Sequence, residues 1–201
     1  MSLRVATRHS PRAAHRTLSL PARRSFITLP GTNSQHLTAT RTLPYARQPL
    51  YDLVADVDSY RHFVPYCSLS RVTQWSQPDA AGRRYPAVAD LHVGWGGFNE
   101  VFTSHLRCVP GVSVEAVSGE AQAGASVGSS VFKSLVTRWS LRSGTSSAQS
   151  PSTEVHLSIR YQFANPLYAA VSAAVSDRVA SLMIEAFEKR AREMLGPTHH
   201  R

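Results

Sequence analysis

The sequence predicts an α+β domain in which a seven-stranded antiparallel sheet curves around one long C-terminal helix. Three observations support this fold class. Residues 153–163 alternate between apolar and polar side chains, which is typical of a half-buried strand. Several earlier segments alternate in the same way, and Gly or Pro separates some of them. The last pattern, from Pro166 to Leu195, has helical period and one apolar stripe.

The elements are expected in the order strand, two short helices, six strands and one helix. A weak strand covers residues 35–43. Helical spacing between Pro49 and Val64 indicates a first helix, and Asp58 is a plausible N-cap for a second short turn. Gly196 and Pro197 end the last helix. The six later strands are expected at residues 68–75, 85–95, 98–107, 112–116, 134–142 and 153–163.

Positive charge is concentrated at the N-terminus. The chain has a formal net charge of +9, and six arginines within residues 1–30 account for all but +3 of it. Arg4, Arg8, Arg12 and Arg16 recur every fourth residue, and no acidic residue precedes Asp52. Residues 1–30 are therefore predicted to be a cleavable mitochondrial targeting segment. A disordered basic tail and a nucleic-acid-binding arm are the alternative interpretations.

The sequence excludes several classes of function. It has no stretch of about 18 apolar residues, so we expect only peripheral membrane contact. Two cysteines are too few for a disulfide framework or a four-cysteine metal site. No phosphate-binding loop, nucleophile elbow or zinc-binding helix motif is present, so we predict no cofactor, metal or catalytic residue. Asp56 and Asp58 are expected to cap the helix junction, and a shared cation or a shared proton is the alternative.

A single helix can fill only part of the concave face of such a sheet. Bulky inward side chains could therefore line a pocket, and a filled core is the alternative. Glu100 shares its phase with Phe102 and would point inward as a polar anchor, unless the preceding glycines break the phase. Trp139 could pack in the core or against a ligand. Lys133, in phase with Trp139, could donate a hydrogen bond to the ligand or extend to solvent.

Several motifs resemble one known family. The most specific is Asp56-Val57-x-x-Tyr60-x-x-Phe63-x-Pro65-x-Cys67. The others are Leu43-Pro44-Tyr45, the segments 93–95 and 102–104, Phe132-Lys133-Ser134-Leu135 followed by Trp139, and residues 187–191. With these motifs, residues 36–196 resemble the START-like polyketide cyclase and coenzyme Q-binding group, which has a helix-grip fold. The chain departs from this group at residues 118–131, where its connection is longer.

This resemblance implies a START-like lipid-binding domain at residues 36–196, followed by a disordered tail at 197–201. It implies a non-catalytic carrier or chaperone that binds ubiquinone, or a related polyisoprenoid lipid, on the matrix side of the mitochondrial inner membrane. Such a protein would support respiration and ubiquinone biosynthesis. Quinone-biosynthesis or respiratory-chain proteins are the expected partners, and no nucleic acid is expected. A ribosome-associated regulatory protein and a cyclase or aromatase are the alternatives.

The expected ligand site combines inward strand positions with one face of the C-terminal helix. That helix is expected mainly to seal the sheet, and contact with the membrane is the alternative. The residues expected to bind the ligand are Val64, Pro65, Val93, Trp95, Phe98, Glu100, Phe102, Lys133, Leu135, Trp139, Tyr161, Phe163, Val171, Val175 and Val179.

Overall fold

The computed structural model describes residues 34–95, 98–119, 132–144, 151–164 and 166–196. Its seven strands form one antiparallel sheet in the order β1-β7-β6-β5-β4-β3-β2. The fold class, the number of strands and the order of the elements are confirmed. The elements are β1 (Ser34–Leu43), α1 (Arg47–Ala55), the 3-10 helix η1 (Val57–His62), β2 (Cys67–Trp75), β3 (Pro86–Trp95), β4 (Phe98–Val109), β5 (Ser113–Gly119), β6 (Phe132–Ser143), β7 (Thr153–Phe163) and α2 (Pro166–Leu195).

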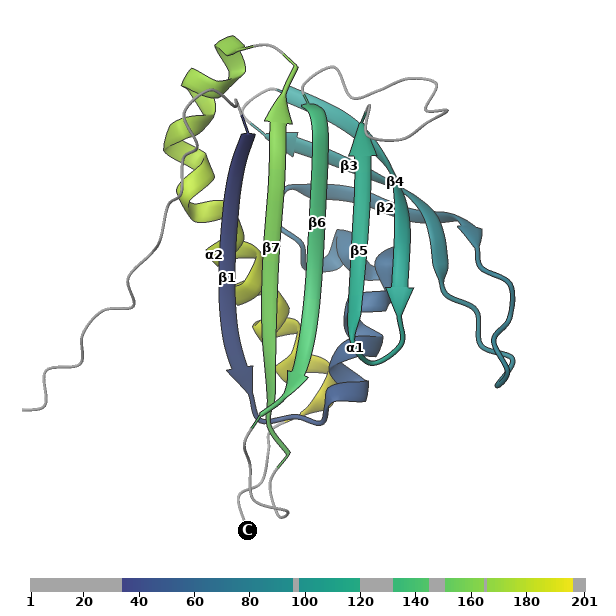
Figure 1. The fold of residues 1–201 in the computed structure, drawn as a ribbon. Coiled ribbons are helices and arrows are strands. Elements are labelled where there is room, and N and C mark those ends of the chain that lie inside the picture. The colour runs from purple at the N-terminus through teal and green to yellow at the C-terminus, as the bar shows by residue number, and fades with distance from the viewer. Residues whose placement is uncertain (1–33, 96–97, 120–131, 145–150, 165, 197–201) are drawn as a thin grey trace, which may run out of the picture.

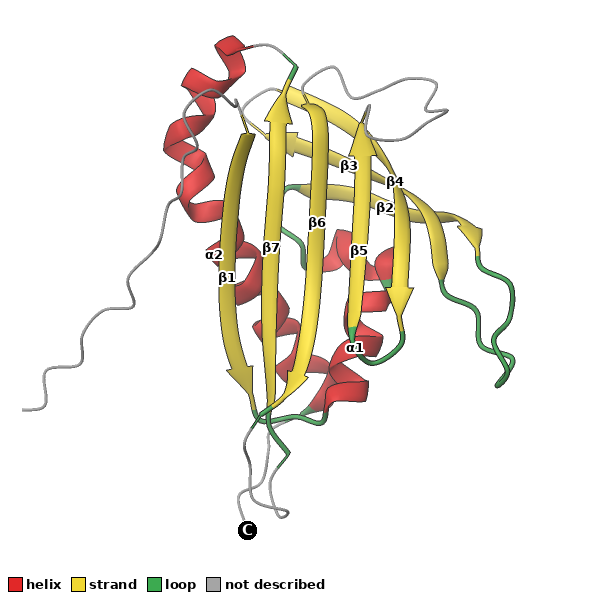
Figure 2. Cartoon of the chain, viewed as in Figure 1, coloured by secondary structure: helices red, strands yellow, loops and turns green. Residues whose placement is uncertain are grey.

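The sheet bends around the helices, and α2 runs behind β1 and β7 (Figure 1). Helix α2 packs mainly against these two strands, whereas α1 contacts β5 and β6 near the lower end of the sheet. Strands β2 and β3 cross behind the upright strands, and β4 curves round to run beside β5 (Figure 2). Helix α2 therefore covers the part of the concave face formed by β1 and β7. Helix α1 lies against β5 and β6.

Strand β7 carries the clearest alternation in the sheet. Val155, Leu157 and Ile159 are all at most 5% exposed, and Tyr161 and Phe163 are each 6% exposed. The side chains between them point to the opposite face of the sheet. They are half-buried, apart from Arg160, which is exposed. This alternation arises because successive side chains of a strand point to opposite faces of the sheet. The β7 strand pairs with β1 on one side and with β6 on the other, so its inward residues form the centre of the core.

Helix α2 presents its most buried face at Ala180, Ile184, Phe187 and Ala191. These positions recur at intervals of four, three and four residues, which is the spacing of one helical face. The apolar stripe expected from the sequence contains Leu167, Val171, Ala174, Val175, Val179, Leu182, Met183, Ala186 and Phe187. It includes Phe187 of the buried face but not Ala180, Ile184 or Ala191. The sequence could not separate the two faces because apolar residues occupy both of them.

The junction between α1 and η1 lacks the helix-capping hydrogen bonds that were expected from Asp56 and Asp58. Asp56 precedes η1, and its side chain makes no capping hydrogen bond. The carboxylate of Asp58 instead accepts a hydrogen bond from the backbone N–H of Val72 on β2, at 2.6 Å. The hydroxyl of Ser70 donates to the Asp58 carbonyl at 3.1 Å. The expectation that Asp58 caps a helix is therefore wrong; it joins η1 to β2.

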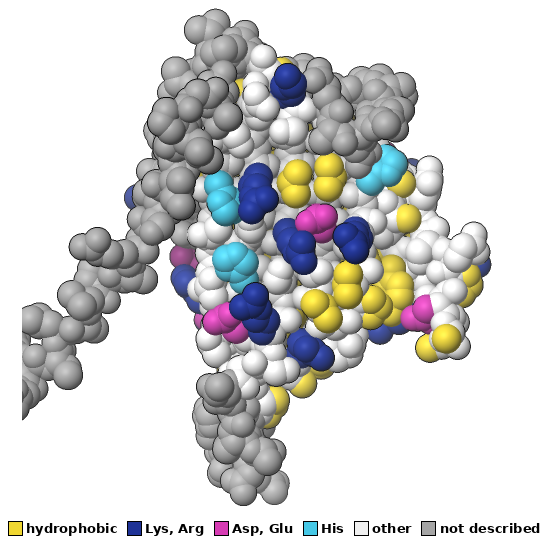
Figure 3. Space-filling model, in the orientation of Figure 1, with side chains coloured by type: hydrophobic (Ala, Val, Ile, Leu, Met, Phe, Trp, Pro, Cys, Tyr) yellow, Lys and Arg dark blue, Asp and Glu magenta, His cyan; other side chains and the backbone are white. Residues whose placement is uncertain are grey.

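The outward face of the sheet carries charged side chains from neighbouring strands (Figure 3). Arg107, Arg138, Arg142 and Arg160 are exposed there. Glu115 lies between two of them in the register, opposite both Arg107 and Arg138, and its carboxylate is 3.3 Å from the Arg138 guanidinium. An ion pair this exposed contributes about 0–1 kcal/mol to stability. The sheet therefore separates an apolar concave face from a charged convex face.

Some expectations fall outside the described residues. They are the targeting segment at 1–30, the tail at 197–201 and most of the longer connection at 118–131. Within the described part of the chain, no helix is long and apolar enough to cross a membrane. The same residues contain no cluster of three or more His, Cys, Asp or Glu side chains that could hold a metal ion.

Candidate ligand-binding cavity

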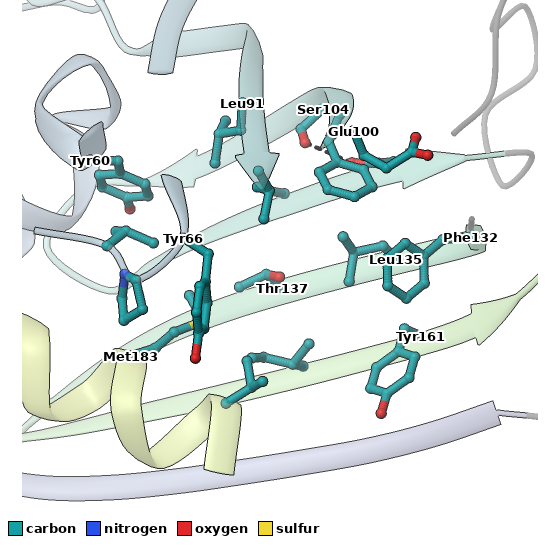
Figure 4. Close-up of a pocket in the computed structure, with 18 of the residues that line it drawn as sticks. Tyr60, Tyr66, Leu91, Glu100, Ser104, Phe132, Leu135, Thr137, Tyr161 and Met183 are labelled. Carbon is teal, nitrogen blue, oxygen red and sulfur yellow. Dashed lines mark hydrogen bonds between the residues drawn. The ribbon is translucent and has the colours of Figure 1, made fainter. Parts of the chain in front are cut away.

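A cavity of about 310 Å³ lies between the concave face of the sheet and α2. Small-molecule sites typically have volumes of about 300–1,000 Å³, so this cavity is large enough for one compact group of a ligand. Figure 4 shows its walls. The lining residues are Leu37, Val57, Tyr60, Val64, Pro65, Tyr66, Leu91, Val93, Glu100, Phe102, Ser104, Leu106, Val114, Ala116, Ser118, Phe132, Leu135, Thr137, Trp139, Ile159, Tyr161, Phe163, Val179, Leu182 and Met183.

The lining is mainly aliphatic and aromatic. Among the described residues that line it, Glu100 is the one carboxylate, and none is Lys, Arg or His. Burying apolar surface contributes about 25 cal/mol per Å² to binding or folding. Such a lining therefore favours a ligand with a large apolar surface. The remaining polar side-chain groups are the indole N–H of Trp139 and the hydroxyls of Tyr60, Tyr66, Ser104, Ser118, Thr137 and Tyr161.

Four aromatic rings from β4, β6 and β7, which we name the aromatic cluster, form one end of the cavity. They belong to Phe102, Phe132, Tyr161 and Phe163. The ring of Phe132 stacks on Phe163, with centroids 4.9 Å apart, and lies 5.6 Å from both Phe102 and Tyr161. Aromatic rings at these distances attract one another by their quadrupoles as well as by burial. A planar ligand ring would find matching surfaces at this end.

Two hydroxyl groups at the cavity wall are bonded to each other. The Oγ atoms of Ser104 and Ser118 are 2.6 Å apart and buried (Figure 4). Tyr60 differs, because its hydroxyl donates to the Val54 carbonyl at 2.6 Å. Burial raises the pKa of the Tyr60 phenol well above its ordinary value, so this donor stays protonated. The Tyr60 hydroxyl therefore stabilises the fold through this hydrogen bond. In the serine pair, one hydroxyl donates to the other, so the proton of the second hydroxyl can be donated to another group.

Tyr66 lies between the cavity and solvent. It lines the cavity, yet it is 43% exposed. Its φ of 65° lies in the left-handed region, which costs a non-glycine residue of order 1–3 kcal/mol. A hydrogen bond from the Gly94 N–H to the Tyr66 carbonyl, at 2.9 Å, holds this conformation. The chain thus keeps a strained backbone at the point where a large side chain covers the cavity.

The structure places most of the expected site residues around one cavity. Those that line it are Val64, Pro65, Val93, Glu100, Phe102, Leu135, Trp139, Tyr161, Phe163 and Val179. The glycines before Glu100 therefore do not break its inward phase. Trp139 also packs on Phe187, with ring centroids 5.1 Å apart, so it belongs to both the core and the wall. The side chains of Trp95, Phe98, Val171 and Val175 lie outside the described part of the structure.

Lys133 does not face the cavity. It is exposed and is absent from the lining, so its expected inward direction is wrong. The cause is a bulge: Phe132 pairs with Phe163, and Ser134 pairs with Gln162, the next residue of β7. One extra residue on β6 reverses the side-chain phase before it. Phe132 therefore points inward in place of Lys133.

The sequence interpretation missed several lining residues for identifiable reasons. Ser104, Ser118 and Thr137 occupy inward strand positions, but small polar residues give no apolar signal. The phase of their neighbours would have located them. Leu182 and Met183 belonged to the expected helix stripe and were not assigned to the site. Tyr66 lies just before β2, where no periodicity predicts a direction.

The sequence is similar to known proteins over most of its length. The model of the family described as polyketide cyclase / dehydrase and lipid transport matches residues 43–188. A mitochondrial coenzyme Q-binding protein of Schizosaccharomyces pombe is 33% identical over 154 residues, which are 77% of this chain and 85% of that protein. One of Eremothecium gossypii is 30% identical, over 87% of this chain and 81% of that protein. A ribosome association toxin of Pseudomonas aeruginosa is 28% identical, over 81% and 99%.

Solved structures share the fold at low sequence identity. The Zhui aromatase/cyclase from Streptomyces sp. R1128 has a TM-score of 0.62 and 15% identity, over 81% of this chain and 96% of that one. A START superfamily protein from Mycobacterium smegmatis has a TM-score of 0.57 and 14% identity, over 79% and 98%. This likeness concerns the fold alone. With the match over residues 43–188, it follows that the chain belongs to the polyketide cyclase / dehydrase and lipid transport family and has a START-like fold.

Proposed function

We propose that this chain binds ubiquinone, or a closely related polyisoprenoid quinone, and carries it without changing it chemically. The observation that supports this most is the cavity of about 310 Å³ with its almost entirely apolar lining. Each methylene group removed from water contributes roughly 0.8 kcal/mol, so such a cavity lowers the cost of moving an insoluble lipid. The coenzyme Q-binding relatives support a quinone as the ligand.

A carrier fits the polar groups of the cavity better than a cyclase does. Catalysis that uses both a general acid and a general base needs two proton-transferring groups within reach of the reacting atoms. Among the described lining residues, Glu100 is the one carboxylate and none is a histidine. The buried hydroxyl of Tyr60 is bonded to the backbone. Glu100 and the bonded pair of Ser104 and Ser118 can instead orient a ligand.

Mass spectrometry of the purified protein tests this proposal. The full chain is expressed in a host that makes ubiquinone, purified without detergent and extracted with organic solvent. We expect a polyisoprenoid quinone in the extract at a substantial fraction of one molecule per chain. An extract that lacks quinones and isoprenoids, together with no uptake from liposomes that contain ubiquinone, would overturn the carrier function.

The proposed location is the matrix side of the mitochondrial inner membrane, with peripheral contact, where the protein supports respiration and ubiquinone biosynthesis. The arginine pattern of residues 1–30 and the mitochondrial relatives support this location. Deleting residues 1–30 is expected to abolish import into isolated mitochondria, measured as protection from added protease. Import of the shortened chain at an unchanged rate would contradict the targeting role.

A second function has one specific observation in its favour. The structure brings Arg107, Arg138, Arg142 and Arg160 together on the outward face of β4, β6 and β7, although they are dispersed in sequence (Figure 3). Clustered arginines attract nucleic-acid phosphates, and one relative is a ribosome association toxin. Glu115 neutralises part of this surface. Salt-sensitive cosedimentation with ribosomes that Arg138→Glu abolishes would support this function, and sedimentation as free protein would oppose it.

A further inference from the structure

The aromatic cluster and Glu100 lie at the same end of the cavity. Glu100 shares its inward strand phase with Phe102, and its backbone pairs with Val93 on β3. Figure 4 shows the Glu100 carboxylate at the end of the cavity where Phe132 and Tyr161 lie. Flat rings and one carboxylate are therefore combined at this end. In a carrier of ring-headed lipids, this is where the ring would be recognised.

The hydrogen-bonding chemistry of a carboxylate does not suit an oxidised quinone. A quinone ring with ether substituents offers carbonyl and ether oxygens, all of which only accept hydrogen bonds. An ionised carboxylate also only accepts. Two acceptors that face each other in an apolar cavity make no hydrogen bond to each other, which disfavours binding. The reduced ring, a hydroquinone, carries two hydroxyl groups that can donate.

A carboxylate can accept from a ligand in addition to its contacts within the protein. It has about four lone-pair sites on its two oxygens. Hydrogen bonds to an ionised acceptor are shorter and roughly twice as strong as those between neutral groups. One such bond to a ligand hydroxyl therefore separates the two redox forms by roughly tenfold or more in dissociation constant.

The other polar groups near this end discriminate less. The hydroxyls of Ser104 and Ser118 bond each other at 2.6 Å, and the pair can still both donate and accept. It can therefore serve a carbonyl or a hydroxyl. The Tyr60 donor is bonded to the Val54 carbonyl at 2.6 Å. The Tyr161 hydroxyl in the aromatic cluster can likewise both donate and accept. Glu100, which only accepts, is therefore the group at this end that distinguishes the hydroquinone from the quinone.

We propose that Glu100, beside the aromatic cluster, makes the cavity selective for rings that carry hydroxyl groups, so that the hydroquinone binds more tightly than the quinone. This inference rests on the proposed carriage of quinones. It extends the ligand class to phenolic, prenylated rings that have free hydroxyls. Tighter binding of the reduced form also raises the reduction potential of the bound pair. A tenfold preference corresponds to about 30 mV for this two-electron couple.

Equilibrium dialysis of the full chain against short-tailed ligands tests the selectivity. Three ligands share one ring and tail: a decyl-tailed ubiquinone, its hydroquinone kept reduced without oxygen, and the dimethyl ether of that hydroquinone. We expect the hydroquinone to bind roughly tenfold more tightly than the quinone. The dimethyl ether, which has no hydroxyl donor, is expected to bind no better than the quinone. This third ligand separates hydrogen bonding from redox state.

Two variants identify the responsible residue. In Glu100→Gln the side-chain amide can both donate and accept, so the preference is expected to fall to less than threefold. Glu115→Gln makes the same change on the outward face of the sheet, where Glu115 pairs with Arg138, and is expected to keep the full preference. A full preference in Glu100→Gln would overturn the role of Glu100.

The wild-type comparison requires no variant and separates this inference from the proposed function. Equal binding of quinone and hydroquinone would overturn the selectivity and leave quinone carriage standing. Binding of none of the three ligands would overturn the carriage itself. Tighter binding of the quinone than of the hydroquinone would also contradict the inference.

Discussion

Replacing Phe187 with alanine is expected to lower the free energy of unfolding by about 3–5 kcal/mol. Phe187 is 1% exposed, and its ring centroid lies 5.1 Å from that of Trp139. This contact joins the only described helix behind β1 and β7 to strand β6. The loss combines the transfer energy of the ring with the cost of the cavity that remains. Domains of this size are stable by about 5–15 kcal/mol, so the variant would lose a large part of that margin.

Urea unfolding followed by circular dichroism measures this loss. Met194, which lies seven residues further along α2 and is 54% exposed, provides the matched control. Met194→Ala is expected to change the free energy of unfolding by less than about 0.5 kcal/mol, as exposed substitutions usually do. A loss in Phe187→Ala that is no larger than the loss in Met194→Ala would contradict the described packing of α2 against the sheet.

Because Trp139 packs against Phe187, substituting Trp139 affects the hydrophobic core as well as the cavity. Its sequence position left two roles open, in the core and against a ligand, and the structure gives it both. Trp139→Ala would therefore lower ligand occupancy and stability together. A change in occupancy in that variant would not identify the ligand site. A residue that lines the cavity but does not belong to the hydrophobic core is better suited to identifying the ligand site.

The parts of the fold that the sequence predicts correctly are those governed by a simple period. The inward residues of β7 were predicted because side chains in a regular strand alternate strictly. The same rule placed Glu100 and Phe102 in the cavity. The rule gave the wrong direction for Lys133, because one bulged residue reverses the inward and outward positions before it. No residue type in this segment indicates the bulge. Local period is therefore informative only as far as the next irregularity.

The cavity itself was not predictable from the sequence. Inward apolar residues are equally consistent with a filled core and with a pocket, since the difference depends on how far α2 covers the sheet. Helix α2 packs against β1 and β7, which leaves space between it and the middle strands. The strained backbone of Tyr66, at φ 65°, is also set by tertiary contacts and not by its own preference. Both features arise from packing between segments that are distant in sequence.

Filling this space is expected to remove the ligand without harming the fold. Ala116 lies on β5 in the cavity wall, paired with Leu106 on β4 and Thr137 on β6. In Ala116→Phe the new ring would extend into the 310 Å³ cavity, and the quinone recovered per chain is expected to fall at least roughly tenfold. Because the ring fills a void, the free energy of unfolding is expected to stay unchanged or to rise by about 0.5–2 kcal/mol.

The neighbouring residue provides the control for this variant. Val117 follows Ala116 on β5 and pairs with Val136 on the outward face, so its side chain points away from the cavity. Val117→Phe adds the same ring to the opposite face and is expected to leave the recovered quinone unchanged. The measurement is the molar ratio of extracted quinone to protein, made beside a urea titration of each variant. A folded Ala116→Phe protein with full quinone content would place the lipid outside this cavity, because a ring and a ligand cannot occupy the same space.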